Sequence, residues 1–143
     1  MKEKIVCVSG YFDCLHVGHL EYFEAAAKYG RLVVILNSDA AAKRKKGYVF
    51  MPYNDRKRLI EALRCVDHVE PVDDADGTVI KALIQIRPDI FCKGGDRGPD
   101  NTPEVEACGH LGIETIWDVG GYKQRSSSEL VASSWDSLLG FGG

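Results

Sequence analysis

Residues 10–19 read Gly10-Tyr11-Phe12-Asp13-Cys14-Leu15-His16-Val17-Gly18-His19. This stretch follows the apolar run Ile5–Val8 and precedes a pattern with helical spacing, so it predicts a turn from a strand into a helix. In an open α/β sheet such turns lie at the carboxyl ends of the strands, where ligands bind. His16 and His19 would share one face at the start of the helix. Backbone N–H groups and the positive end of the helix dipole gather there too, which suits a phosphate chain.

The histidine pair has two other interpretations. A His-x-x-His pair can hold a metal ion, but no third Cys, His or carboxylate lies at ligand spacing. One of the two imidazoles can instead cap the helix or lie in the core. Both alternatives stay open at this point.

The composition is that of an ordinary globular protein. The 143 residues make one domain, with 45% apolar residues, 27% charged residues and a net charge of −3, so no nucleic-acid partner is expected. No apolar stretch is long enough to span a membrane, and Met1–Lys4 leads into a strand without a signal-peptide core. We expect a cytoplasmic protein with no membrane partner.

The cysteines give no metal or disulfide pattern. They are odd in number, scattered, and without a C-x-x-C motif. Such usage predicts a reduced protein with neither disulfides nor a zinc site. The residues are Cys7, Cys14, Cys65, Cys92 and Cys108.

Strands and helices alternate along the whole chain. Strands are expected at residues 4–9, 32–36, 66–72, 89–92 and 113–119. Helices are expected at 17–29, from an Asn54 N-cap, from 79 to before Pro88, after Thr102-Pro103, and from near Ser127. Alternation of this kind predicts an α/β fold, a single Rossmann-like domain over 1–143 with a five-stranded parallel sheet in the order 3-2-1-4-5. Helices would cover both faces, and residues 140–143 would form a frayed tail.

The helical spacing also predicts which side chains are buried. The helix after Asn54 would bury a stripe of Leu59, Ile60 and Leu63. The next helix would bury a second stripe, which consists of Val79, Ile80, Leu83 and Ile84.

A basic segment follows the second strand. It reads Lys43-Arg44-Lys45-Lys46-Gly47 and is interpreted as a loop. Four successive cations can be a solvated surface run. Beside a predicted anion site, they would instead neutralise a triphosphate or the phosphate of a second substrate.

Two further polar segments fall at the same edge of the predicted sheet. Lys93-Gly94-Gly95-Asp96 follows the fourth strand and is either a plain turn or a place of close backbone approach to a ligand. Ser126–Glu129 has a capping-box pattern, preceded by Arg125. A capped helix start is compatible with a phosphate cradle.

Residues 10–19 resemble the G-x-F-D-x-x-H-x-G-H signature of the nucleotidyltransferase superfamily, which includes cytidylyltransferases and heptose-phosphate adenylyltransferases. Four more segments resemble the heptose-phosphate adenylyltransferases, whereas glycerol-3-phosphate cytidylyltransferases share the first signature. These segments are Asn37-Ser38-Asp39, Lys43-Arg44-x-Lys46-Gly47, Arg56 and Lys93-Gly94-Gly95-Asp96. Residues 48–52 are more apolar than expected beside a sugar phosphate.

The resemblance implies roles for individual residues. The implied catalytic residues, which stabilise the transition state or hold phosphates, are His16, His19, Lys46 and Arg125. The implied nucleotide-binding residues are Gly10, Tyr11, Phe12, Asp13, Gly18, Lys93, Gly94, Asp96, Ser126, Ser127 and Ser128, with Asp13 also bracing the turn. The implied acceptor-binding residues are Lys43, Lys46 and Arg56. No side chain is implied as a metal ligand, and Mg²⁺ would be held mainly by the nucleotide phosphates.

The expected reaction is transfer of a nucleoside monophosphate from a nucleoside triphosphate, with ATP favoured, to a small phosphorylated acceptor such as a sugar phosphate. Pyrophosphate would leave, and catalysis would consist of positioning and charge stabilisation. One alternative is a CTP-dependent enzyme acting on glycerol-3-phosphate or a similar polyol or amino-alcohol phosphate. Another is a non-catalytic nucleotide-binding module. The resemblance also implies a homodimer.

Overall fold

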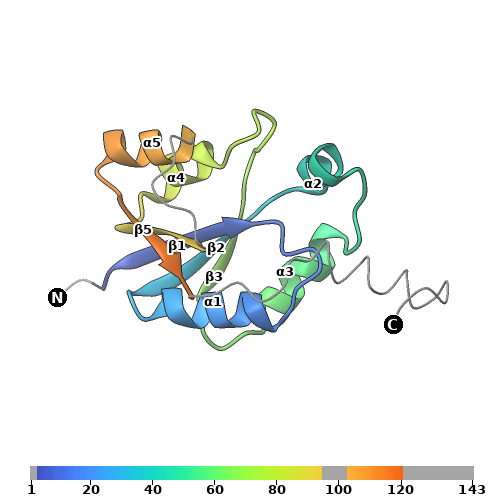
Figure 1. Cartoon of the computed structure of the whole chain (residues 1–143), viewed down its shortest axis with the longest axis horizontal. Coiled ribbons are helices and arrows are strands. Elements are labelled where there is room, and N and C mark those ends of the chain that lie inside the picture. Colours follow the sequence, from blue (N-terminus) through green and yellow to red (C-terminus); the bar gives the residue numbers. More distant parts are fainter. Residues whose placement is uncertain (1–2, 95–102, 121–143) are drawn as a thin grey trace.

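A computed structural model describes residues 3–94 and 103–120. Their five strands form one parallel sheet in the order β3-β2-β1-β4-β5 (Figure 1). The predicted order is therefore confirmed. β1 lies at the centre and pairs with β2 and β4. The strands are β1 (Ile5–Gly10), β2 (Arg31–Leu36), β3 (His68–Pro71), β4 (Ile90–Gly94) and β5 (Glu114–Val119). The domain limits stay a prediction, and the last helix and the tail at 140–143 lie outside the described residues.

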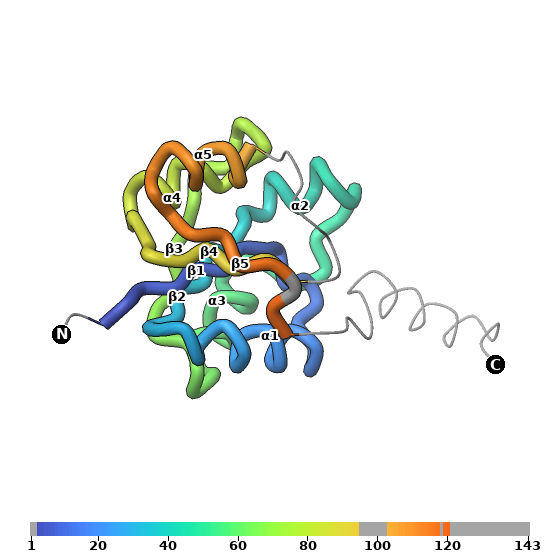
Figure 2. The backbone as a smooth tube through the Cα atoms, turned by 60° about the vertical axis from the view of Figure 1, so that its left-hand side comes forward, coloured from blue at the N-terminus to red at the C-terminus, as the bar shows by residue number. Residues whose placement is uncertain are grey.

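Helices cover both faces of the sheet, as predicted. Figures 1 and 2 show α1 and α3 on one face and α4 and α5 on the other. The remaining helix, α2, lies beyond the sheet, on the side where β2 ends. The helices are α1 (Val17–Ala27), α2 (Asp39–Lys46), α3 (Tyr53–Glu61), α4 (Ile80–Ile86) and α5 (Pro103–Leu111).

The core has two parts because successive strand residues point to opposite faces. Val6 and Val8 of β1 pack in one cluster with Phe23 of α1. Cys7, between them, packs in the other cluster with Leu83 of α4. Strands buried on both faces explain why they read as continuous apolar runs.

The predicted basic loop is wrong, because residues 43–46 are the last turn of α2. The Ala41 N–H donates to Ser38 Oγ at 3.0 Å, which caps the start of the helix. Gly47, at φ +87°, ends it in the left-handed conformation. These two cap residues are the sequence signals that mark a helix here.

Two predicted buried stripes are also partly wrong. Leu59 is 48% exposed, because α3 turns Arg56 and Ile60, one turn apart, toward the interior. Ile84 is 50% exposed, because Ala82 and Leu83 are the α4 residues that are buried. α3 also begins after Pro52 rather than Asn54 and has no side-chain cap.

All five cysteines are free thiols. Burial raises the pKa of Cys7 and of Cys92 to about 12, so both stay protonated at neutral pH. No helix within residues 3–94 and 103–120 is both long enough and apolar enough to cross a membrane.

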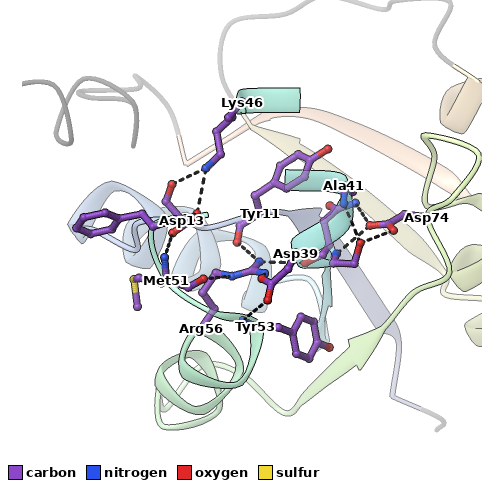
Figure 3. Close-up of polar contacts among 12 residues, drawn as sticks. Tyr11, Asp13, Asp39, Ala41, Lys46, Met51, Tyr53, Arg56 and Asp74 are labelled. Atoms are coloured by element: carbon purple, nitrogen blue, oxygen red, sulfur yellow. Dashed lines mark hydrogen bonds and ion pairs between the residues drawn. The ribbon is translucent and has the colours of Figure 1, made fainter. Parts of the chain in front are cut away.

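Asp74 fastens the loop after β2 to the loop after β3. Its carboxylate is almost wholly buried and accepts hydrogen bonds from Asn37 Nδ2 (3.0 Å), the Ser38 N–H (2.9 Å) and Ser38 Oγ (2.7 Å). Its backbone carbonyl accepts from Arg44 at 2.9 Å. Ser38 also caps α2. By holding Ser38, Asp74 therefore helps to fix the position where α2 begins (Figure 3).

Asp74 is expected to make stability depend on pH. Burial raises the pKa of Asp74, but the hydrogen bonds from Ser38 and Asn37 outweigh it and leave the net pKa below the ordinary 3.8. Because the pKa is lower in the folded state, the ionised carboxylate contributes to the free energy of unfolding above pH 3.8. This contribution is lost as the pH falls through the pKa of the folded state. Asp74→Asn should therefore lower the free energy of unfolding by about 1–3 kcal/mol at neutral pH.

The measurement is urea unfolding of both proteins from about pH 7 to about pH 3. The difference between Asp74→Asn and the unchanged protein should shrink toward the acid end. A difference that stays constant over this range would contradict the role given to the ionised carboxylate.

Candidate active site

The turn after β1 folds an aromatic side chain back beneath the site. Phe12 has a φ of +51°, which few residues other than glycine adopt. Its buried ring packs edge-on against Phe23 (4.9 Å between ring centroids) and His19 (5.0 Å). A Cβ at position 10 would lie 2.8 Å from Phe12 Cζ, so Gly10 leaves room for the ring. The Phe12 ring thus supports the turn from within the core. This position differs from the predicted role, in which Phe12 contacts the nucleotide.

His16 and His19 hold each other at the start of α1. His16 is the N-cap residue, and its Nδ1 accepts the Gly18 N–H at 3.1 Å. The Nδ1 of His19 accepts the N–H of His16 at 3.2 Å, which completes a capping box. The two rings stack with their centroids 3.8 Å apart. A Cβ at position 18 would lie 2.8 Å from His16 Cε1, so the glycine between the histidines is required for this arrangement.

These hydrogen bonds determine the tautomer of both rings. A neutral imidazole has one N–H donor and one acceptor nitrogen, and in both rings Nδ1 is the acceptor. The proton of each neutral ring therefore lies on Nε2. The helix-cap interpretation is confirmed for His16, whose Nε2 is buried within the protein.

Asp13 joins the turn to the segment after α2. Its buried carboxylate accepts the Phe50 N–H through Oδ2 (2.8 Å) and the Met51 N–H through Oδ1 (2.6 Å). The Lys46 ammonium group donates to the Asp13 carbonyl (2.8 Å) and lies 3.4 Å from Oδ2 (Figure 3). Asp13 therefore braces the turn, as the resemblance implies. Its carboxylate is engaged by the protein rather than aimed at a nucleotide.

Arg56 does not have the predicted role of binding the acceptor. Its side chain is fully buried, and its guanidinium donates to the carbonyls of Met51 (2.9 Å), Tyr11 (2.7 Å) and Asn37 (2.9 Å). It also donates to Asp39 Oδ1 at 2.6 Å. Arg56 thus ties together the turn after β1, the end of β2, the start of α2 and the segment before α3 (Figure 3).

The other predicted residues are placed as follows. Lys43 is exposed on α2, and the Lys93 ammonium lies 5.4 Å from the Phe91 ring centroid. Gly94 ends β4 against Tyr22 of α1, where a Cβ would lie 3.2 Å from the tyrosine ring. Asp96, Arg125, Ser126, Ser127 and Ser128 lie outside the described residues and stay predictions.

Sequence reasoning missed Tyr22, whose hydroxyl donates to the Cys92 carbonyl at 2.8 Å and so ties α1 to β4. It also missed Asp74. A contact between α1 and β4 joins residues far apart in the sequence, and no local pattern signals it.

The chain belongs to the cytidylyltransferase-like family, whose family model matches residues 7–119. Membership confirms the expected class of enzyme, a nucleotidyltransferase. The chain is 38% identical over 122 residues to the "Bifunctional protein HldE" of Hydrogenovibrio crunogenus, covering 83% of this chain and 23% of that protein. It is 37% identical to the protein of the same name from Photorhabdus laumondii, covering 83% of this chain and 24% of that protein. The chain thus spans about a quarter of the length of these curated relatives.

A solved structure has the same fold. It is described as the lipopolysaccharide core biosynthesis protein from Thermoplasma volcanium GSS1. The two chains superpose with a TM-score of 0.72 at 30% sequence identity, over 85% of this chain and 99% of the other.

Removing Arg56 should destabilise the fold far more than removing an exposed arginine from the same helix. Arg56→Met leaves buried carbonyls and Asp39 without their donor, so the free energy of unfolding should fall by about 3 kcal/mol or more. Arg58 is exposed on α3, and Arg58→Met should change it by less than about 0.5 kcal/mol. Urea unfolding measures both, and equal effects would contradict the buried role of Arg56.

Proposed function

We propose that this enzyme transfers adenylate from ATP to a sugar phosphate. An oxygen of the acceptor phosphate forms a bond to the α-phosphorus, and the bond from that phosphorus to the bridging oxygen toward the β-phosphorus breaks. Pyrophosphate leaves with the electron pair of that bond. The reaction needs no covalent enzyme intermediate, so the protein's contribution is to bring two polyanions together and to stabilise charge.

The arrangement of His16 and His19 carries this proposal. Two stacked imidazoles stand at the N-terminus of α1, next to the positive end of its dipole, where an anion is favoured. Lys46, from α2, contacts Asp13 in the same turn. The helix start and a lysine from a second helix thus belong to the same turn, and this supports the proposal that the turn binds phosphate.

The identity of the substrates rests on similarity. Relatives named HldE, and a solved structure described as a lipopolysaccharide core biosynthesis protein, favour a sugar-phosphate acceptor. The resemblance of the segments around Lys43 and Lys93 to adenylyltransferases favours ATP. A CTP-dependent transfer to a polyol or amino-alcohol phosphate is the second candidate, because the matching family is cytidylyltransferase-like.

Mg²⁺ is proposed to enter with the nucleotide. Within residues 3–94 and 103–120, no group of three or more His, Cys, Asp or Glu side chains is placed to hold a metal ion. The site residues described there are mainly donors and cations, which suit phosphate rather than a metal. Mg²⁺ commonly binds through substrate phosphates and retained waters, and when bound it would neutralise phosphate charge. A homodimer and a cytoplasmic location stay predictions.

The decisive experiment measures pyrophosphate release with ATP or CTP, each against sugar phosphates and polyol phosphates. Release with ATP and a sugar phosphate is the expected result. Release with CTP and a polyol phosphate alone would favour the second candidate. Nucleotide binding without release with any acceptor would point to the non-catalytic module.

His16→Asn tests the catalytic role without removing the helix cap. Asparagine is a strong N-cap residue, so stability should be kept while the imidazole is lost. The rate of pyrophosphate release should fall about a hundredfold or more. In His16→Ala the rate of pyrophosphate release should fall by the same factor, and the free energy of unfolding should also fall by about 1 kcal/mol. Unchanged turnover in His16→Asn would contradict the assignment.

A further inference from the structure

Two tyrosines lie against the lysines at the end of α2. The Lys45 ammonium is 5.0 Å from the ring centroid of Tyr11. The Lys46 ammonium is 5.9 Å from the centroid of Tyr11 and 5.4 Å from that of Tyr48. Ammonium groups within about 6 Å of a ring centroid are attracted by the ring quadrupole. Figure 3 shows the Tyr11 ring close to Lys46.

Tyr11 is a rigid platform for these contacts. Its carbonyl accepts a hydrogen bond of 2.7 Å from the buried Arg56, which fixes the backbone under the ring. Burial is the main cause that raises the pKa of Tyr11, and the negative charge of Asp74 is the second. The phenol is therefore neutral at neutral pH. The lysines therefore meet a neutral ring rather than a phenolate.

The cluster carries an excess of positive charge. Among the described residues, Asp13 is the one carboxylate within ion-pair distance of either lysine, and it pairs with Lys46. Asp13 already accepts two backbone N–H groups as well. Lys45 lies over the Tyr11 ring and is exposed. A phosphate group would supply the missing negative charge.

We propose that Tyr11 is a positioning residue whose ring, together with that of Tyr48, holds the ammonium groups of Lys45 and Lys46 for binding substrate phosphate. Lys45 thereby joins the phosphate-binding residues, although the resemblance implied only Lys43 and Lys46 on this helix. Tyr11 occupies a position that the G-x-F-D signature leaves open. The inference rests on the proposed function only for the identity of the substrates.

Binding of inorganic pyrophosphate, measured by isothermal titration calorimetry, tests the proposal without knowledge of the acceptor. Tyr11→Leu keeps apolar bulk but removes the ring face, and it should weaken binding about three- to tenfold because two cation–π contacts are lost. Tyr11→Phe keeps the ring and should restore tight binding. In the Lys45→Met/Lys46→Met background, Tyr11→Leu should have no further effect, since it acts through the lysines.

Three outcomes would overturn the inference. They are equal binding by Tyr11→Leu and the unchanged protein, a Tyr11→Phe variant as weak as Tyr11→Leu, or a full effect of Tyr11→Leu in the lysine-free background. Tyr48→Leu is the second variant, should Tyr11→Leu not fold. Tyr48 is exposed, and of the two lysines its ring contacts Lys46. Tyr48→Leu should therefore weaken pyrophosphate binding less than Tyr11→Leu does. Unchanged binding by Tyr48→Leu would refute the role of this ring.

The test separates this inference from the proposed function. Failure of the unchanged protein to bind pyrophosphate would overturn the inference about the lysines. Nucleotidyl transfer is measured independently, by release of pyrophosphate from ATP or CTP in the presence of an acceptor. Nucleotidyl transfer by the unchanged protein, together with equal pyrophosphate binding by Tyr11→Leu, would support the proposed function and refute the role of the Tyr11 ring.

Discussion

The reciprocal hydrogen bonds between His16 and His19 are the interaction on which the site depends. Each ring uses Nδ1 to satisfy a backbone N–H at the start of α1, which an ordinary helix would leave without a partner. The same bonds fix the ring orientation and put the proton of each neutral ring on Nε2. The start of α1 is thus capped by the same two side chains that we propose to serve phosphate binding.

The surrounding residues of the turn serve this arrangement sterically. Gly18 leaves space for the His16 ring, and Gly10 leaves space for Phe12, whose ring supports His19. Larger residues at either glycine would bring a Cβ within 2.8 Å of a ring atom. In this structure, the glycines of the turn are therefore needed for packing around the imidazoles rather than for a positive φ.

Buried charges hold the second half of the site in place. Asp13, Arg56 and Asp74 are almost wholly buried, and each is satisfied by several hydrogen bonds. Burying such groups is costly unless all their bonds are made, so each one specifies the position of the loops that surround it. Together they place α2, and with it Lys46, beside the turn after β1.

The alternation of apolar runs and helical patterns was enough to predict the sheet order, because parallel strands buried on both faces have a clear sequence pattern. The histidine pair was predictable because its spacing is local. α2 was missed because it buries only Ala41 and Ala42 and has no apolar stripe. The roles of Arg56 and Asp74 depend on partners far away in the sequence, and such polar contacts leave no periodic signal.

The reciprocal capping predicts the tautomer of His16 and of His19 in the free protein, and this tautomer can be measured directly. Long-range ¹H–¹⁵N NMR correlations distinguish the protonated from the unprotonated ring nitrogen at a pH where the rings are neutral. His16→Asn assigns one signal among the four histidines. The structure predicts that both rings carry the proton on Nε2, with Nδ1 unprotonated. A proton on Nδ1 of either neutral ring would contradict the reciprocal capping.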